Sequence, residues 1–87
     1  MAKRNKLEII RDILKIIQEN RAIKSTPLIR KSNLSSSRFK EYYLELLNKE
    51  FIKETYGKNK TITLSKKGYK YLEKYSTIIS FIDEFEL

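Results

Sequence analysis

The residue types that could carry out chemistry in this 87-residue chain are carboxylates, amines, hydroxyls and phenols. The sequence contains no His and no Cys, so the imidazole and thiolate groups that titrate most usefully near neutral pH are absent. For the same reason the chain cannot form a disulfide scaffold or a metal site built on His or Cys. We therefore expect no cofactor and no metal ion.

Two pairs of carboxylates could still suggest an enzyme. Glu8 with Asp12, and Glu41 with Glu45, each stand four residues apart, a spacing that places both groups on one face of a helix. Such a pair can bind a metal ion or share a proton. Here each pair lies among Lys and Arg residues, and the whole chain has only two glycines for a loop that could cradle a phosphate. We therefore expect that the protein is not an enzyme.

Basic side chains are the most abundant chemical groups. The chain has 19 Lys and Arg residues against 11 Asp and Glu residues, and all 19 lie within residues 1–75 together with only 8 acidic ones. The last twelve residues contain only acidic charges, at Asp83, Glu84 and Glu86. A basic body with a pI near 9.7 indicates a polyanionic partner, most commonly nucleic acid. A lysine-rich solubilising surface is the alternative.

The sequence predicts neither a membrane span nor an export signal. No apolar run reaches the roughly eighteen residues that a membrane helix needs. The chain begins with Met1-Ala2-Lys3-Arg4-Asn5-Lys6 and continues into a charged amphipathic stretch, not an apolar signal core. We expect a cytoplasmic protein, associated with the nucleoid, that does not bind membranes.

The elements that would position the basic groups begin with an amphipathic helix from Leu7 to Glu19. Apolar residues recur there at three- and four-residue steps. They are Ile9, Ile10, Ile13, Leu14, Ile16 and Ile17. Asn20 tolerates a left-handed helix end, so the helix should stop there. Residues 21–25 are too few for a helix, contain one apolar residue of the kind that is buried, Ile23, and are expected to form a brief strand.

The next two helices are separated by a tight turn. Thr26 and Pro27 predict the start of a short helix, because Thr can cap a helix and Pro suits its first position. A turn follows at Ser32 and Asn33, and Ser35 then caps a longer helix. The apolar side of that helix is made by Phe39, Tyr43, Leu46 and Leu47. A short helix, a turn and a longer helix form a helix-turn-helix arrangement.

After Glu50 the apolar period changes to two. Residues 51–56 and 61–64 are rich in β-branched and aromatic side chains and predict two strands. Gly57-Lys58-Asn59-Lys60 would form the polar, basic tip of a hairpin. Ser65 then caps a last helix, in which Gly68 could allow close packing. The sequence therefore predicts an α+β, mainly α fold with a small antiparallel hairpin.

Three stretches carry a family resemblance. They are Lys6 through Leu14, Asn33-Leu34-Ser35 with Phe39-Lys40 and Tyr42 through Leu47, and Leu64-Ser65-Lys66-Lys67-Gly68. Together they resemble the small archaeal winged-helix DNA-binding proteins, which include predicted transcriptional regulators and basic chromosomal proteins. The resemblance implies a winged helix-turn-helix with a hairpin wing and a dimer joined by a C-terminal coiled coil. The chain departs from the family at Glu50, where a helix-ending Gly is usual, and at the C-terminal helix, which stops at Leu87, so we expect any coiled coil to be short.

The candidate DNA-binding residues lie on the third helix, at the hairpin tip and beside the short helix. They are Ser36, Ser37, Arg38, Lys40 and Glu41, then Lys58, Asn59 and Lys60, and finally Arg30 and Lys31. Serine and arginine on the third helix can hydrogen-bond to bases in the major groove, whereas the lysines of the tip would reach phosphates. Only Arg38 offers a bidentate fork, so we expect sequence-tolerant or moderately specific binding. Ordinary solvated surfaces are the alternative.

The last helix carries a second pattern. Its apolar residues repeat at alternating steps of four and three, the spacing of a coiled-coil seam. They are Tyr71, Tyr75, Ile78, Ile82 and Phe85. We expect residues 1–75 to form the DNA-binding domain and residues 76–87 to form a C-terminal extension of the last helix that dimerises. Packing of this extension on its own domain is the alternative.

These features together predict a homodimer that binds double-stranded DNA and regulates transcription. Two alternatives stay open. One is a chromosome-organising protein that coats DNA. The other is a winged-helix subunit of a transcription or replication assembly, which would dock through Leu44, Ile79 and Phe81. No residue pattern identifies a small-molecule effector.

Overall fold

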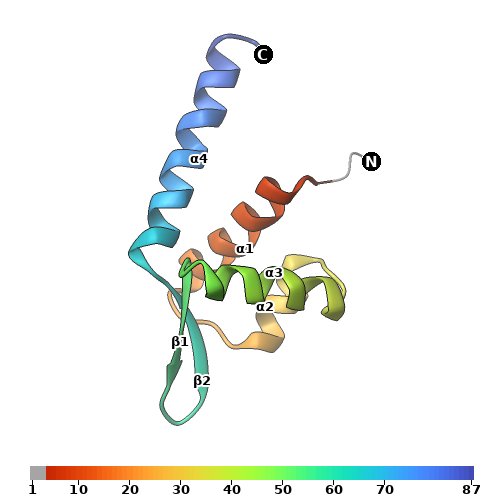
Figure 1. The fold of residues 1–87 in the computed structure, drawn as a ribbon, viewed down its shortest axis with the longest axis vertical. Helices are drawn as coiled ribbons and strands as arrows, with labels where there is room; N and C mark the ends of the chain where they lie inside the picture. Colours follow the sequence, from red (N-terminus) through yellow and green to blue (C-terminus); the bar gives the residue numbers. More distant parts are fainter. Residues whose placement is uncertain (1–3) are drawn as a thin grey trace.

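The computed structural model describes residues 4–87, and its elements follow the expected order (Figure 1). They are α1 (Lys6–Asn20), α2 (Ser25–Ser32), α3 (Ser36–Asn48), β1 (Ile52–Tyr56), β2 (Lys60–Leu64) and α4 (Lys66–Glu84). In Figure 1 the hairpin projects from one end of the body formed by α1, α2 and α3, and the C-terminal half of α4 projects from the other end. The mainly α fold class with an antiparallel hairpin is confirmed.

Helix α1 is the centre of the core. It begins with a capping box, in which the Asn5 side chain accepts from the Glu8 amide at 2.8 Å and the Glu8 carboxylate accepts from the Asn5 amide. Its buried face consists of Ile9, Ile10, Ile13, Leu14 and Ile17. The helix ends at Asn20 as expected, but the residue with positive φ is Arg21, at 61°.

The segment between α1 and α2 is not a strand. Ile23 forms a single antiparallel bridge with Ile62, with N–H···O distances of 3.0 and 2.8 Å. Because α2 already begins at Ser25, too few residues are left for a longer ladder. The expected strand at 21–25 is therefore reduced to one bridging residue, which extends the hairpin along the outer edge of β2.

The predicted cap of α2 was wrong. The N-cap residue is Lys24, which makes no side-chain capping bond, and Thr26 lies inside the helix. Pro27 is the third helical residue, a position where its missing N–H leaves no intrahelical bond unmade. The following turn is as expected: Asn33 is left-handed (φ 60°, ψ 33°), and the Ser35 hydroxyl caps α3 by accepting from the Arg38 amide.

The hairpin pairs Ile52 with Leu64 at its base and Tyr56 with Lys60 at its end. Ile52, Ile62 and Leu64 are buried against the core. Since strand side chains alternate between faces, Glu54 lies on the same face as Ile52 but farther out, whereas Lys53 lies on the opposite face. Lys60, which was expected at the tip, is the first residue of β2. The tip itself is formed by residues 57–59.

Helix α4 joins the core mainly through its first turns. The Ser65 hydroxyl accepts from the Gly68 amide at 3.1 Å and donates to the Glu50 carbonyl at 2.6 Å. Gly68 is the only α4 residue that is fully buried, and Tyr71 and Leu72 pack partly against the core. Every residue after Tyr75 is exposed.

Candidate nucleic-acid interface

Helix α3 presents one apolar and one polar face. Phe39 and Leu46 are buried, and Tyr43 and Leu47 are half-buried, so the helix is anchored along the side that the sequence predicted. The residues on its other side are all exposed: Ser36, Ser37, Arg38, Lys40, Glu41 and Leu44. Within the described part of the chain, neither Arg38 nor Lys40 makes an ion pair. Both cations are therefore available to an anionic ligand.

Beside α3, the last turn of α2 carries Arg30 and Lys31, and both are exposed. At this C-terminal end the helix dipole is negative, so these cations stabilise α2 and the helix end itself does not attract an anion. The Lys31 ammonium donates to the Asn20 side-chain carbonyl at 3.3 Å. Any phosphate contact here would come from the two side chains alone.

The tip of the hairpin is exposed from Tyr56 to Lys60. Lys58 and Asn59 are both exposed, and Figure 1 shows the ribbon of β1 and β2 leaving the body. Lys60 differs from them because its ammonium lies 3.3 Å from a carboxylate oxygen of Glu54 and 5.9 Å from the centre of the Tyr43 ring. Of the three candidate DNA contacts at the tip, Lys60 alone is held by Glu54 and Tyr43.

A polar cluster between α3 and the hairpin was not expected from the sequence. The Glu54 carboxylate accepts from the hydroxyls of Tyr43 and Tyr56 and from the Lys60 ammonium. The hydrogen bond from Tyr43, followed by that from Tyr56, lowers the pKa of Glu54. Burial, and then the hydrogen bond to Glu54, raises the pKa of Tyr43. One indication of this cluster was present in the sequence: polar side chains at positions 54 and 56 lie on the same strand face as the apolar Ile52.

Three of the four paired carboxylates have structural partners, whereas Glu41 is exposed and makes no ion pair among the described residues. Glu8 closes the capping box of α1, and Asp12 lies 2.9 Å from Arg4 and 3.2 Å from Arg11. Glu45 lies 2.7 Å from Lys6, whose hydrogen bond lowers the pKa of Glu45. Among residues 4–87 there is no group of three or more His, Cys, Asp or Glu residues that could hold a metal ion. None of the described helices is long and apolar enough to cross a membrane.

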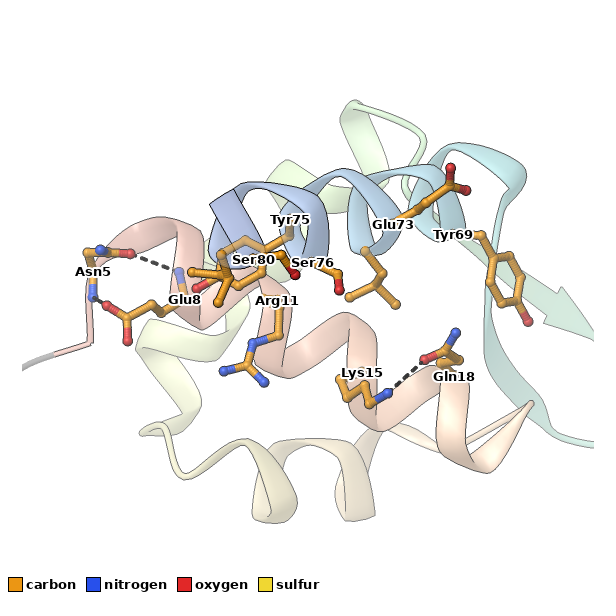
Figure 2. Close-up of a pocket in the computed structure, with 12 residues that line it drawn as sticks. Asn5, Glu8, Arg11, Lys15, Gln18, Tyr69, Glu73, Tyr75, Ser76 and Ser80 are labelled. Carbon is orange, nitrogen blue, oxygen red and sulfur yellow. Dashed lines mark hydrogen bonds between the residues drawn. The ribbon is translucent and has the colours of Figure 1, made fainter. Parts of the chain in front are cut away.

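A groove of about 870 Å³ separates α1 from α4 (Figure 2). Its α1 wall carries Glu8, Arg11, Lys15 and Gln18, and its α4 wall carries Tyr69, Leu72, Glu73, Tyr75, Ser76, Ile79 and Ser80. The Arg11 guanidinium lies 5.5 Å from the centre of the Tyr75 ring. The lining mixes both signs of charge with apolar side chains, and the groove runs beside the part of α4 that leaves the body.

The expected dimer seam of α4 divides into two parts. Tyr71 packs edge-on against Phe51, donates its hydroxyl to the Leu7 carbonyl at 3.0 Å and stacks on Tyr75. These two tyrosines are therefore engaged within the protomer. Ile78, Ile82 and Phe85 are 56%, 36% and 59% exposed, and Ile79 and Phe81 beside them are exposed as well. The second half of α4 is thus an apolar helix surface without a partner among the described residues.

Comparisons with known proteins agree with this architecture. The sequence model of a family described as winged helix-turn-helix matches residues 3–83. Uncharacterized protein MJ0290 of Methanocaldococcus jannaschii is 38% identical over 80 residues, which cover 92% of this chain. The match covers 36% of that relative, so the chain spans about a third of the length of the curated relative it matches.

Proposed function

The chain belongs to the winged helix-turn-helix family, and from that premise we propose that it binds double-stranded DNA as a homodimer and regulates transcription. The observation that carries the proposal is the exposed polar face of α3, which lies beside a hairpin with a basic tip. A helix anchored on one side and free on the other can enter the major groove, while the hairpin holds the flanking backbone.

The proposal gives each group a role. Arg38 would form the bidentate contact to guanine, and Ser36 and Ser37 would make permissive contacts to bases or phosphates. Glu41 would accept from cytosine or pair with a lysine. The phosphate contacts would come from Arg30, Lys31, Lys40, Lys58, Asn59 and Lys60. With a single bidentate reader, discrimination between sequences should be moderate.

The dimer would form through the second half of α4. Its exposed residues Ile78, Ile82 and Phe85 form a stripe that water would otherwise cover, and Tyr71 and Tyr75 continue this stripe toward the domain. Such a pair of helices spans only about two heptads, so the groove between α1 and α4 would add contact area for the second copy. The acidic residues near the C-terminus, Asp83, Glu84 and Glu86, would then lie away from DNA or against basic residues of the partner.

Salt-dependent binding to duplex DNA tests the first part of the proposal. If about six phosphates are neutralised, the logarithm of the affinity for a random duplex should fall with the logarithm of salt concentration at a slope of about −5. Replacing Arg38, Lys40, Lys58 and Lys60 together by Ala should weaken binding about a hundredfold and flatten that slope. The matched control replaces four exposed lysines elsewhere, Lys15, Lys66, Lys70 and Lys74. Equal losses in the two variants would show that α3 and the wing are not the DNA face.

Sedimentation tests the dimer. Ile78→Asp with Ile82→Asp should give a monomer, because burying four carboxylates per dimer in an apolar seam is unfavourable. Thr77→Asp adds a carboxylate to α4 outside both the seam and the lining of the groove, and should leave the mass unchanged. If the variant with Ile78→Asp and Ile82→Asp is still a dimer, α4 does not form the dimer interface.

A protein-docking role is the second candidate, because Leu44 is 49% exposed in the middle of the polar face of α3. In this alternative the exposed Ile79 and Phe81 would also contact a partner protein. Weak binding to any duplex at low salt would favour this protein-docking role.

Genome-wide occupancy separates the two DNA-binding roles, since a few sharp peaks indicate a regulator and continuous coverage indicates a chromosome-coating protein.

A further inference from the structure

One carboxylate links the wing to α3. Glu54 stands on β1, and its side chain is 19% exposed. It accepts hydrogen bonds from Tyr43 of α3, from Tyr56 two residues along its own strand at 2.7 Å, and from Lys60 of β2 at 3.3 Å. A single side chain therefore connects a helix and both strands of the hairpin.

The outer half of the hairpin has little else to hold it. Its buried residues are Ile52 and Leu64 at the base and Ile62, which pairs with Glu54 at the middle of the ladder; the bridge from Ile23 is also made at Ile62. Beyond this level Thr55 and residues 56–60 are exposed. A two-stranded ribbon in water is only marginally stable by itself. The Glu54 cluster is thus the outermost attachment of the wing to α3 among the described residues.

We propose that Glu54 is a positioning residue that fixes the wing relative to α3, so that the tip and the helix can contact one duplex together. The inference rests on the proposed DNA binding. Hydrogen bonds to an ionised carboxylate are about twice as strong as neutral ones, which suits a link that must hold an otherwise mobile ribbon. A wing already held in place loses less conformational entropy when it binds.

The Glu54 cluster also changes how much positive charge the wing presents to DNA. Glu54 partly neutralises Lys60, so Lys60 would act mainly as part of the link and Lys58 as the freer phosphate contact. An electrostatic brake is the competing explanation, in which Glu54 only withholds Lys60 from DNA. The two explanations differ in sign: loss of the link should weaken binding, whereas release of a brake should strengthen it.

The experiment compares Tyr43→Phe and Glu54→Gln with Tyr56→Phe as the matched control. Tyr43→Phe and Tyr56→Phe each remove one hydroxyl from the same carboxylate, but only Tyr43 comes from α3. NMR relaxation of the free protein reports the order of residues 57–60, and thermal unfolding confirms that each variant is folded. Titration of a duplex at several salt concentrations then reports its affinity and salt slope.

We expect order parameters at the tip to fall from about 0.85 toward 0.6 in Tyr43→Phe and Glu54→Gln, and to stay unchanged in Tyr56→Phe. Affinity for the duplex should drop about tenfold in the first two variants and less than about twofold in the control. Unchanged tip order in both linking variants would overturn the inference while leaving DNA binding intact. Tighter binding with a steeper salt slope in Glu54→Gln would overturn it in favour of the brake. Absence of binding by the unmodified chain would instead refute the proposed function, and with it the role of the link in DNA binding.

Discussion

At the residue scale, Gly68 shows how closely α4 approaches the segment between α3 and β1. A Cβ atom added there would lie 2.3 Å from the Phe51 carbonyl oxygen and 3.1 Å from Leu64 Cδ2. The first of these contacts is with backbone, so a side chain cannot simply rotate away. The close approach that the sequence suggested for this glycine is a requirement of the packing.

Gly68→Ala should therefore lower the free energy of unfolding by about 2 kcal/mol, even though alanine is the better helix former. Chemical denaturation measures this loss. Gly57→Ala is the control, since an added Cβ there has no atom within 4 Å and should change stability by less than about 0.5 kcal/mol. A loss at Gly68 no larger than at Gly57 would show that the segment around Phe51 moves freely.

Glu50 is the residue at which the chain departs from its family resemblance, and its φ is 62°. A left-handed conformation costs a residue with a Cβ atom about 1 kcal/mol, whereas glycine adopts it freely. We expect Glu50→Gly to raise the free energy of unfolding by up to about 1 kcal/mol, measured by denaturation. Lys49→Gly should instead lower it, because Lys49 has an ordinary φ of −86°. If Glu50→Gly is instead the more destabilising of the two variants, the Glu50 side chain stabilises the fold by more than its left-handed backbone destabilises it.

At the scale of elements, the helices are fixed by unequal caps. Ser35 caps α3 with one exposed hydrogen bond, whereas the buried Ser65 caps α4 and also donates to the Glu50 carbonyl. Ser35→Ala should lower the free energy of unfolding by about 1 kcal/mol, and Ser65→Ala by about 2 kcal/mol because a second, partly buried hydrogen bond to the Glu50 carbonyl is lost as well. Denaturation of the two variants checks the ranking. Equal losses would mean that water replaces the Ser65 hydroxyl.

The contact between α3 and the hairpin should make stability depend on pH at both extremes. Glu54 has a lowered pKa, so its contribution is present above the ordinary value of 4.5 and is lost as pH falls through the folded pKa. Tyr43 has a raised pKa, so its contribution is present below 10.0 and is lost as pH rises toward the folded pKa. Denaturation across pH should show both declines, and Tyr43→Phe should reduce the alkaline one. An alkaline decline that Tyr43→Phe leaves unaltered would show that another group causes it, such as Tyr71, whose pKa is also raised by burial.

At the scale of the whole molecule, the chain is elongated because α4 continues beyond its domain. Its principal extents are 48, 29 and 21 Å, and Figure 1 shows the C-terminal half of α4 standing clear of the body. The buried apolar residues of the core all lie between Ile9 and Leu64. The extension therefore adds little to the packing of its own protomer.

A chain that ends after Tyr75 should stay cooperatively folded and become monomeric. Its core is retained, while the exposed residues of the seam, Ile78, Ile82 and Phe85, are removed. Sedimentation reports the mass, and thermal unfolding at several protein concentrations reports whether stability still depends on association. Loss of cooperative unfolding would mean that residues 76–87 belong to the domain.

Features that depend on neighbouring residues could be predicted from the sequence alone. The apolar period of residues 7–19, the turn at Asn33 and the caps at Ser35 and Ser65 depend on contacts within a few positions, so the element order and the exposed face of α3 were predictable. The dipeptide Thr26-Pro27 misled at this same scale, because the chain enters α2 two residues earlier.

Only the tertiary structure decided the contacts between distant segments. It holds Lys60 against Glu54 and Tyr43, and turns Tyr71 toward Phe51 and Leu7. The periodic pattern of α4 was the same for Tyr71 as for Ile78, yet only Tyr71 lies beside the domain. The physical reason is that periodicity fixes which side of an element is apolar, whereas the packing of elements fixes what that side meets.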